Sequence, residues 1–169
     1  MKEMFEAMLK HMAWADRRIG EALAAFSGDA AGGGAADPRH AEADAETTAL
    51  LAEAVRLYAH IVAAETVWLA RLAGDESLLA PVWPAWNAAE TRAKSEEVLG
   101  RYERFLADCS DFRQTVSYRT SAGVPYATSA ADILTHVFLH GSYHRGQINA
   151  RLRGAGREPV NVDYITFVR

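Results

Sequence analysis

The chain of 169 residues is 50% hydrophobic and 24% charged, and it carries a formal net charge of −4. This length and composition are typical of one globular domain, residues 1–169, large enough to bury a full hydrophobic core. Because positive and negative side chains are interspersed and acidic residues outnumber basic ones, the charge pattern argues against a nucleic-acid partner and against an anionic membrane surface.

Cysteine content and hydropathy together indicate a cytoplasmic protein. The single cysteine, Cys109, excludes an intramolecular disulfide and is compatible with a reducing compartment. Its position near a predicted helix end favours a small packing residue over a nucleophile. No segment of the sequence is long and apolar enough to span a bilayer, and the first residues lack the apolar core of a signal peptide. We therefore expect no membrane partner.

The N-terminal part predicts a helix followed by a flexible connection. Apolar residues recur at steps of three and four over 3–26, which predicts an amphipathic helix. Its stripe consists of Phe5, Met8, Met12, Ala15, Ile19, Ala22 and Phe26. His11 lies off the centre of this stripe, and Asp16 is interpreted as a surface acid. Residues 27–44 contain three consecutive glycines without the lysine of a phosphate-binding loop, so they predict a flexible connection.

A second helix is predicted over 45–73, which has no internal glycine or proline. It is apolar on two sides: one carries Leu50, Leu57, Ile61 and Trp68, and the other carries Leu51, Val55, Tyr58, Val62 and Leu69. Such a helix lies at the centre of a bundle or in a subunit interface, and on this ground we expect a homodimer. His60 lies at the edge of the first side, where a histidine taken alone is most often a core or boundary residue.

Residues 81–108 predict an irregular segment and then a third helix. The irregular part, 81–86, contains Trp83 and Trp86 and is expected to cover one end of the core. Asn87 is the expected N-cap of a helix that runs to about Asp108.

A short hairpin and a fourth long helix complete the predicted fold. Residues 115–119 and 124–127 alternate around a Ser-Ala-Gly turn, which predicts two short strands. A capping-box pattern at 129–132 opens the fourth helix, which reaches about Arg153 and precedes a tail that packs back across the bundle. Four long helices with short connections predict an all-α, antiparallel four-helix bundle, a fold that builds metal sites between facing helices.

Three histidines in the fourth helix form the clearest candidate site. His136, His140 and His144 follow one another at steps of four, so consecutive rings lie on one helix face about 6 Å apart along the axis. Burying an imidazole among apolar residues costs free energy unless its nitrogens find partners, and a metal ion held by His-x-x-x-His is one such partner. A hydrogen-bonded core histidine is the alternative. The spacing allows either pair, and the apolar stripe favours His140 with His144.

Several segments resemble the DinB/YfiT-like family of four-helix bundles. The most specific is the His-Arg-Gly-Gln run at 144–147, inside a matching stretch from 136 to 156. The other matching segments are Trp14-Ala15-Asp16, residues 60–65 with Trp68 and Arg71, and residues 159–164 of the tail. The resemblance covers nearly the whole chain, with the exception of the connection at 27–44.

This resemblance implies a divalent metal ion, zinc or nickel, held by three histidines. The implied ligands are His60, His140 and His144. His136 then lies beside the site as a neighbour and not as a ligand. Gln147 lies within one turn of His144 and is a candidate outer contact to a ligand or to substrate. Arg145 points about 100° away from His144 and is expected to pair with another helix or with the tail.

Three neutral imidazoles leave a coordination position open, which is typical of a catalytic metal site. That position would take a water molecule, with its pKa lowered toward about 7, or a substrate thiolate. The resemblance implies a metal-dependent hydrolase, or a transferase that uses a low-molecular-weight thiol such as bacillithiol or mycothiol, acting on a small molecule. The alternative is a non-catalytic, dimeric stress-response module that binds metal. Glu53 and Glu65 are the acids that could supply a base.

Overall fold

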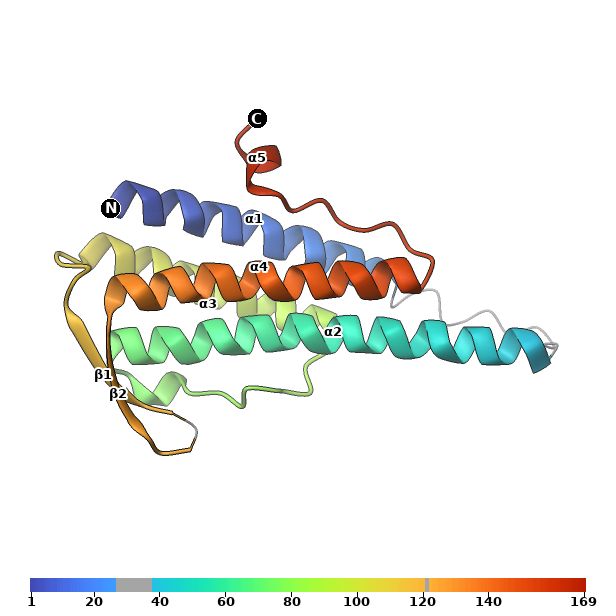
Figure 1. The fold of residues 1–169 in the computed structure, drawn as a ribbon, viewed down its shortest axis with the longest axis horizontal. Helices are drawn as coiled ribbons and strands as arrows, with labels where there is room; N and C mark the ends of the chain where they lie inside the picture. Colours follow the sequence, from blue (N-terminus) through green and yellow to red (C-terminus); the bar gives the residue numbers. More distant parts are fainter. Residues whose placement is uncertain (27–37, 121) are drawn as a thin grey trace.

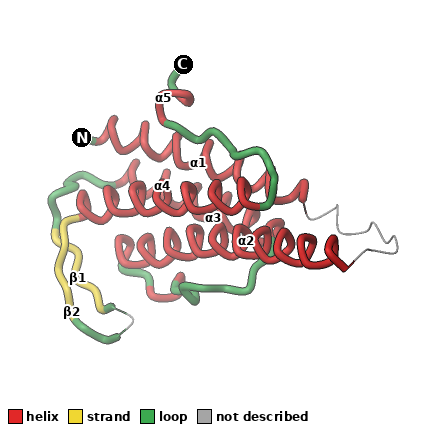
Figure 2. The backbone as a smooth tube through the Cα atoms, turned by 45° about the vertical axis from the view of Figure 1, so that its right-hand side comes forward, coloured by secondary structure: helices red, strands yellow, loops and turns green. Residues whose placement is uncertain are grey.

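The computed structural model describes residues 1–26, 38–120 and 122–169. Four long helices lie alongside one another as a bundle (Figure 1): α1 (Lys2–Phe26), α2 (Pro38–Ala73), α3 (Ala88–Asp108) and α4 (Ala130–Gly154). A two-stranded hairpin stands at the end of the bundle where α2 ends and α4 begins (Figure 2). The predicted fold class, an all-α bundle with a short hairpin before the last long helix, is confirmed.

Helix α2 begins at Pro38, seven residues before the predicted start at 45. Proline is favoured in the first turn of a helix, because its φ angle is already helical and the first turn needs no amide donor. The prediction that the flexible connection extends to 44 is therefore wrong for 38–44. The remainder of that connection, 27–37, lies outside the described residues.

Side-chain caps set the first residues of α3 and α4, as predicted. Asn87 and Glu90 form a reciprocal capping box, in which each side chain accepts a hydrogen bond from the other residue's backbone amide at 2.9 Å. At the start of α4, Ser129 Oγ accepts a hydrogen bond from the Asp132 amide at 3.1 Å and donates one to Asp132 Oδ2 at 2.6 Å. A defined start for α4 also fixes which face its histidines occupy.

The hairpin consists of β1 (Thr115–Arg119) and β2 (Pro125–Ser129), which pair antiparallel from Thr115↔Ser129 to Arg119↔Pro125. Strand β2 continues directly into α4. A short 3₁₀ helix, η2 (Glu76–Leu78), follows α2, and the chain then runs back along α2 before α3 begins (Figure 1). This returning segment brings residues 81–86 beside the middle of α2.

The C-terminal tail packs against the bundle, as expected. Asn149 on α4 exchanges two hydrogen bonds of 2.8 Å with the backbone of Val160. Beyond this point, the short helix α5 (Tyr164–Phe167) contacts α1. None of the helices in the described residues is long and apolar enough to cross a membrane.

The hydrophobic core has two clusters with a polar layer between them. One cluster contains Met12, Leu69 and Phe138, and the other contains Ile19, Val62 and Ile148. Between these positions α1, α2 and α4 each contribute one buried ionisable residue: Asp16, Glu65 and Arg145. The candidate histidines lie next to this layer: His140 and His144 lie between Phe138 and Ile148 on α4, and His60 lies just before Val62 on α2. The middle of the bundle is therefore where its polar side chains are concentrated.

Candidate metal centre

His60, His140 and His144 come together between α2 and α4. One ring nitrogen from each residue lies within 4.8 Å of the corresponding nitrogens of the other two. The ring centroids of His60 are 5.1 Å from His140 and 4.7 Å from His144, and those of His140 and His144 are 4.4 Å apart. Within the part of the chain that the structure describes, no further His, Cys, Asp or Glu joins this group.

The helix geometry explains why these residues meet. His140 and His144 lie one turn apart on one face of α4. Helix α2 runs antiparallel beside α4 (Figure 1), so that Trp68 contacts His136 near the start of α4 while Glu53 reaches Arg151 near its end. His60 lies between Glu53 and Trp68 along α2 and therefore faces the middle of α4.

The ring of His60 is held in one orientation by the segment that returns along α2. Its Nδ1 lies 2.8 Å from the carbonyl oxygen of Val82. A carbonyl oxygen only accepts hydrogen bonds, so Nδ1 carries the proton and Nε2 keeps its lone pair. Trp83 stacks on the same ring at 3.9 Å with an interplanar angle of 10°. The tryptophan expected to cover one end of the core instead covers a candidate ligand.

The ring of His144 is oriented in a comparable way. Its Nδ1 donates to the side-chain oxygen of Gln147, one turn along α4, at a distance of 2.8 Å. Gln147 therefore contacts His144 directly, and Nε2 of His144 is left as an acceptor. Histidines that bind metal ions are commonly held by a carbonyl, carboxylate or amide oxygen on their second nitrogen, because this contact selects the tautomer and the ring orientation.

Burial favours the neutral form of two of the clustered rings, His140 and His60. Burial, together with the proximity of His144 and His60, lowers the pKa of His140 to about 4. Burial also lowers the pKa of His60, although its hydrogen bond to Val82 opposes that shift. Neutral imidazoles with free lone pairs are the form that a metal ion needs, since protonated rings offer no lone pair.

Two of the remaining histidines lie apart from the group. His136 is exposed, and its ring centroid is 5.0 Å from Trp68 and 5.5 Å from His140. His11 is buried on α1, with Nε2 2.8 Å from the carbonyl oxygen of Val162. Sequence analysis also placed neither of them among the ligands. Nothing is described of the side chain of His40.

Comparison with known proteins identifies the family of this chain. The model of the DinB family matches residues 1–169. The chain belongs to the DinB family. In addition, a stretch of 64 residues is 34% identical to Protein DinB of Bacillus subtilis (strain 168), covering 38% of this chain and 37% of that protein. The match with this curated relative thus spans little more than a third of the relative's length.

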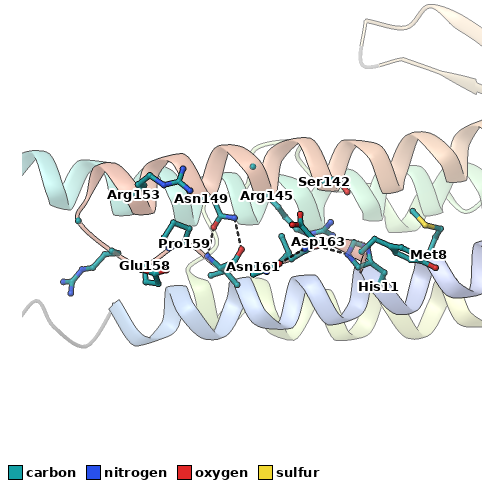
Figure 3. A pocket seen from close by; sticks show the side chains of 16 residues that line it. Met8, His11, Ser142, Arg145, Asn149, Arg153, Glu158, Pro159, Asn161 and Asp163 are labelled. Atoms are coloured by element: carbon teal, nitrogen blue, oxygen red, sulfur yellow. Dashed lines mark hydrogen bonds between the residues drawn. The ribbon is translucent and has the colours of Figure 1, made fainter. Parts of the chain in front are cut away.

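Arg145, which follows His144 in this DinB-family chain, points away from the histidine group, toward α1. Its Nε and Nη2 donate to Asp16 Oδ1 on α1 at 3.0 and 2.8 Å, and Nη2 lies 4.0 Å from Glu65 Oε1 on α2. Figure 3 shows Arg145 reaching from α4 toward α1, beside a cavity of about 840 Å³ that is lined by α1, α4 and the C-terminal tail. Arg145 therefore ties together the three helices that flank the site.

The interpretation of Asp16 as a surface acid is wrong, because its side chain is fully buried. Met12, Asp16 and Ile19 follow one another at steps of four and three, so the spacing already assigned position 16 to the inner face. A partner for the carboxylate could not be read from the local sequence, since Arg145 is 129 residues away. The predicted pairing of Arg145 with another helix is present.

The two buried carboxyls differ in their contacts with Arg145. Burial raises the pKa of Asp16, and it raises the pKa of Glu65 further, because Asp16 adds repulsion while Arg145 lies closer to Asp16 than to Glu65. Of the two carboxyls, Glu65 is therefore the one whose protonated form the fold favours more strongly. Glu53, the other candidate base, is exposed and accepts a hydrogen bond from Arg151 at 3.0 Å. Neither acid belongs to the histidine group.

Proposed function

We propose that His60, His140 and His144 bind one divalent metal ion, zinc or nickel, and that the protein is a metal-dependent enzyme acting on a small molecule. The observation that carries this proposal is the convergence of three ring nitrogens within 4.8 Å of one another from two different helices. Nitrogen ligands lie about 2.0–2.1 Å from zinc, so the three rings must move closer together for one ion to contact all of them.

The surroundings of the histidines fit a metal better than they fit a packed core. A core histidine usually satisfies both nitrogens with hydrogen-bond partners. Here Val82 and Gln147 each accept the Nδ1 proton of one ring, at 2.8 Å in both cases, and leave the Nε2 lone pairs of His60 and His144 free. Three clustered imidazoles match the donor set that zinc and nickel prefer.

A site with three protein ligands has room for a further ligand, and this supports catalysis over a purely structural role. When bound, the ion supplies Lewis acidity, which makes a water molecule or a thiol nucleophilic at neutral pH. The protein's own residues hold the rings in position and shield one side of the group with Trp83. We therefore propose a hydrolase, or a transferase that uses a low-molecular-weight thiol.

We also propose that the protein is a homodimer, although helix α2 now gives this proposal less support. Many of its apolar residues are buried within the chain, including Tyr58, Ile61, Val62 and Leu69. Light scattering measures the mass in solution directly. A mass of 18.5 kDa, that of a single chain, would contradict the proposal.

Metal analysis of single-alanine variants tests the ligand set. We expect one equivalent of metal in the parent protein and loss of that metal in His60→Ala, His140→Ala and His144→Ala. His136→Ala is the matched control, because this histidine belongs to the same helix stripe but lies outside the group. Retention of metal by His60→Ala, or an equal loss in His136→Ala, would contradict the proposed site.

Two further measurements separate catalysis from a structural role. Metal-loaded and metal-stripped protein are compared in a screen of thiols with electrophiles, and equal rates in both forms would remove the catalytic proposal. Thermal melts of His144→Ala complement this screen. A catalytic site loses metal while the bundle stays folded, whereas a structural site, as in a non-catalytic binding module, loses much of its stability together with the metal.

A further inference from the structure

Arg71 occupies an aromatic setting at the hairpin end of α2. The central carbon of its guanidinium lies 4.3 Å from the ring centroid of Trp68 and 4.7 Å from that of Tyr118. These two rings meet edge to face at 5.3 Å, and Nη2 of Arg71 donates to the carbonyl oxygen of Arg119 at 3.3 Å. Contacts with α2 and β1 therefore hold the guanidinium in one place.

Among the residues that the structure describes, the charge of Arg71 has no acidic partner. Several other arginines are ion-paired, namely Arg17, Arg101, Arg145 and Arg151. In contrast, no carboxylate within the described ranges lies within 4.0 Å of the half-buried Arg71. A guanidinium offers five N–H donors in a rigid fork that matches a carboxylate, and cation–π contacts leave those donors free. Arg71 is thus held in position with most of its hydrogen-bonding capacity unused.

A cavity of about 890 Å³ lies beside Arg71, between the end of α2 and the hairpin. Its lining includes Arg71, Arg119, Tyr118 and Tyr126, together with one acidic residue, Glu76. Two cationic side chains outnumber the single acid, and with two aromatic rings they suit a small organic anion; the volume is within the range of small-molecule sites.

A series of ring contacts connects this cavity to the candidate metal centre. The centroids of His140 and His136 are 5.5 Å apart, those of His136 and Trp68 are 5.0 Å apart, and Arg71 lies 4.3 Å from Trp68. All of these side chains come from the facing sides of α2 and α4. Arg71 and His140 are therefore separated by two intervening rings, and an extended small molecule is needed to contact both.

We infer that Arg71 binds a carboxylate of the substrate while the reacting end of the same molecule lies at the histidine group. Trp68 and Tyr118 hold the guanidinium, and the cavity takes the part of the substrate next to its carboxylate. This inference rests on the proposed function in assuming that the reaction occurs at the histidines. The binding of a carboxylate by Arg71, however, can be measured without any metal or any reaction.

The test uses phenylacetate as the probe and phenylacetamide as its uncharged counterpart, titrated into metal-free and zinc-loaded protein and followed by NMR. We expect phenylacetate to bind both forms, and Arg71→Gln to weaken this binding at least about tenfold, since one charge-assisted pair is lost. Arg71→Lys keeps the charge but not the fork, and it should recover part of the affinity. Arg18→Gln is the matched control, because Arg18 also lies over a tryptophan, Trp14, at 5.1 Å.

Three results would overturn the inference: equal affinity in Arg71→Gln, equal binding of phenylacetamide, or no binding of phenylacetate at millimolar concentration. Tighter binding of inorganic phosphate than of phenylacetate would overturn the assignment to a carboxylate. The metal content of Arg71→Gln is measured in parallel and should equal that of the parent protein. An error in the proposed metal site would therefore appear in the metal content, whereas an error in the proposed role of Arg71 would appear in the titrations.

Discussion

Replacement of Glu65 by glutamine should remove a pH dependence from the stability of the bundle. Glu65 is 1% exposed, and burial raises its pKa well above the ordinary value of 4.5. Glutamine has nearly the same shape as a protonated glutamate, and its side-chain amide can donate a hydrogen bond to the Asp16 carboxylate. The variant therefore mimics the protonated form of Glu65, which burial favours in the folded protein.

The sign of the effect follows from proton binding in the two states. Below pH 4.5, folded and unfolded chains both carry the proton on Glu65, so the group adds no pH dependence there. Above that value the unfolded chain releases the proton while the folded chain keeps it, and unfolding becomes easier. The free energy of unfolding of the parent protein should fall relative to Glu65→Gln by about 1.4 kcal/mol per pH unit until the raised pKa is reached.

Urea denaturation followed by circular dichroism, from pH 5 to pH 8 and with a chelator present, measures this difference. The chelator removes any contribution from metal binding. Glu53→Gln is the control, since its exposed pair with Arg151 is expected to contribute less than about 1 kcal/mol without a comparable trend. If the stabilities of the parent and Glu65→Gln stay parallel over this pH range, the buried carboxyl is ionised in the folded state and the reasoning is refuted.

The remaining predictions concern α4. Gln147→Met keeps the length of the side chain but removes the acceptor for His144 Nδ1. The metal affinity, measured by competition with a chelator, should therefore fall by about 10–100-fold, while the melting temperature stays unchanged. An unchanged affinity would show that the contact is dispensable. A Cβ on Gly141 would lie 3.0 Å from Arg145 Nη2, so Gly141→Ala should cost about 1–3 kcal/mol in urea. Gly146→Ala meets no atom within 4 Å and should instead stabilise the helix by about 0.5–1 kcal/mol, and equal effects at the two glycines would contradict this account.

The parts of the fold that depend on local spacing could be predicted from the sequence. The apolar stripe of α1, the cap at Asn87 and the face shared by His140 and His144 all follow from residues within a few positions of one another. The start of α2 was missed because glycines and alanines dominate the composition around it, whereas Pro38 is compatible with a first helical turn.

The candidate site could be predicted only in part. Spacing allowed either pair on α4, and the apolar stripe favoured His140 with His144. The inclusion of His60 came from the family resemblance, because no local pattern reveals which helix faces which. The hydrogen bond from His60 to Val82 was not foreseeable, since it depends on the path of an irregular segment. The burial of Asp16 could have been foreseen from its place on the inner stripe, although its partner Arg145 could not.

Mutations should affect the orientations of His60 and His144 differently. The acceptor for His60 is a main-chain carbonyl at residue 82, which every amino acid supplies, whereas the acceptor for His144 is the side chain of Gln147. A saturation library should therefore tolerate many residues at 82 and few at 147. Insertions and deletions between 79 and 87 should instead disturb the orientation of His60, since they move the carbonyl of residue 82 itself.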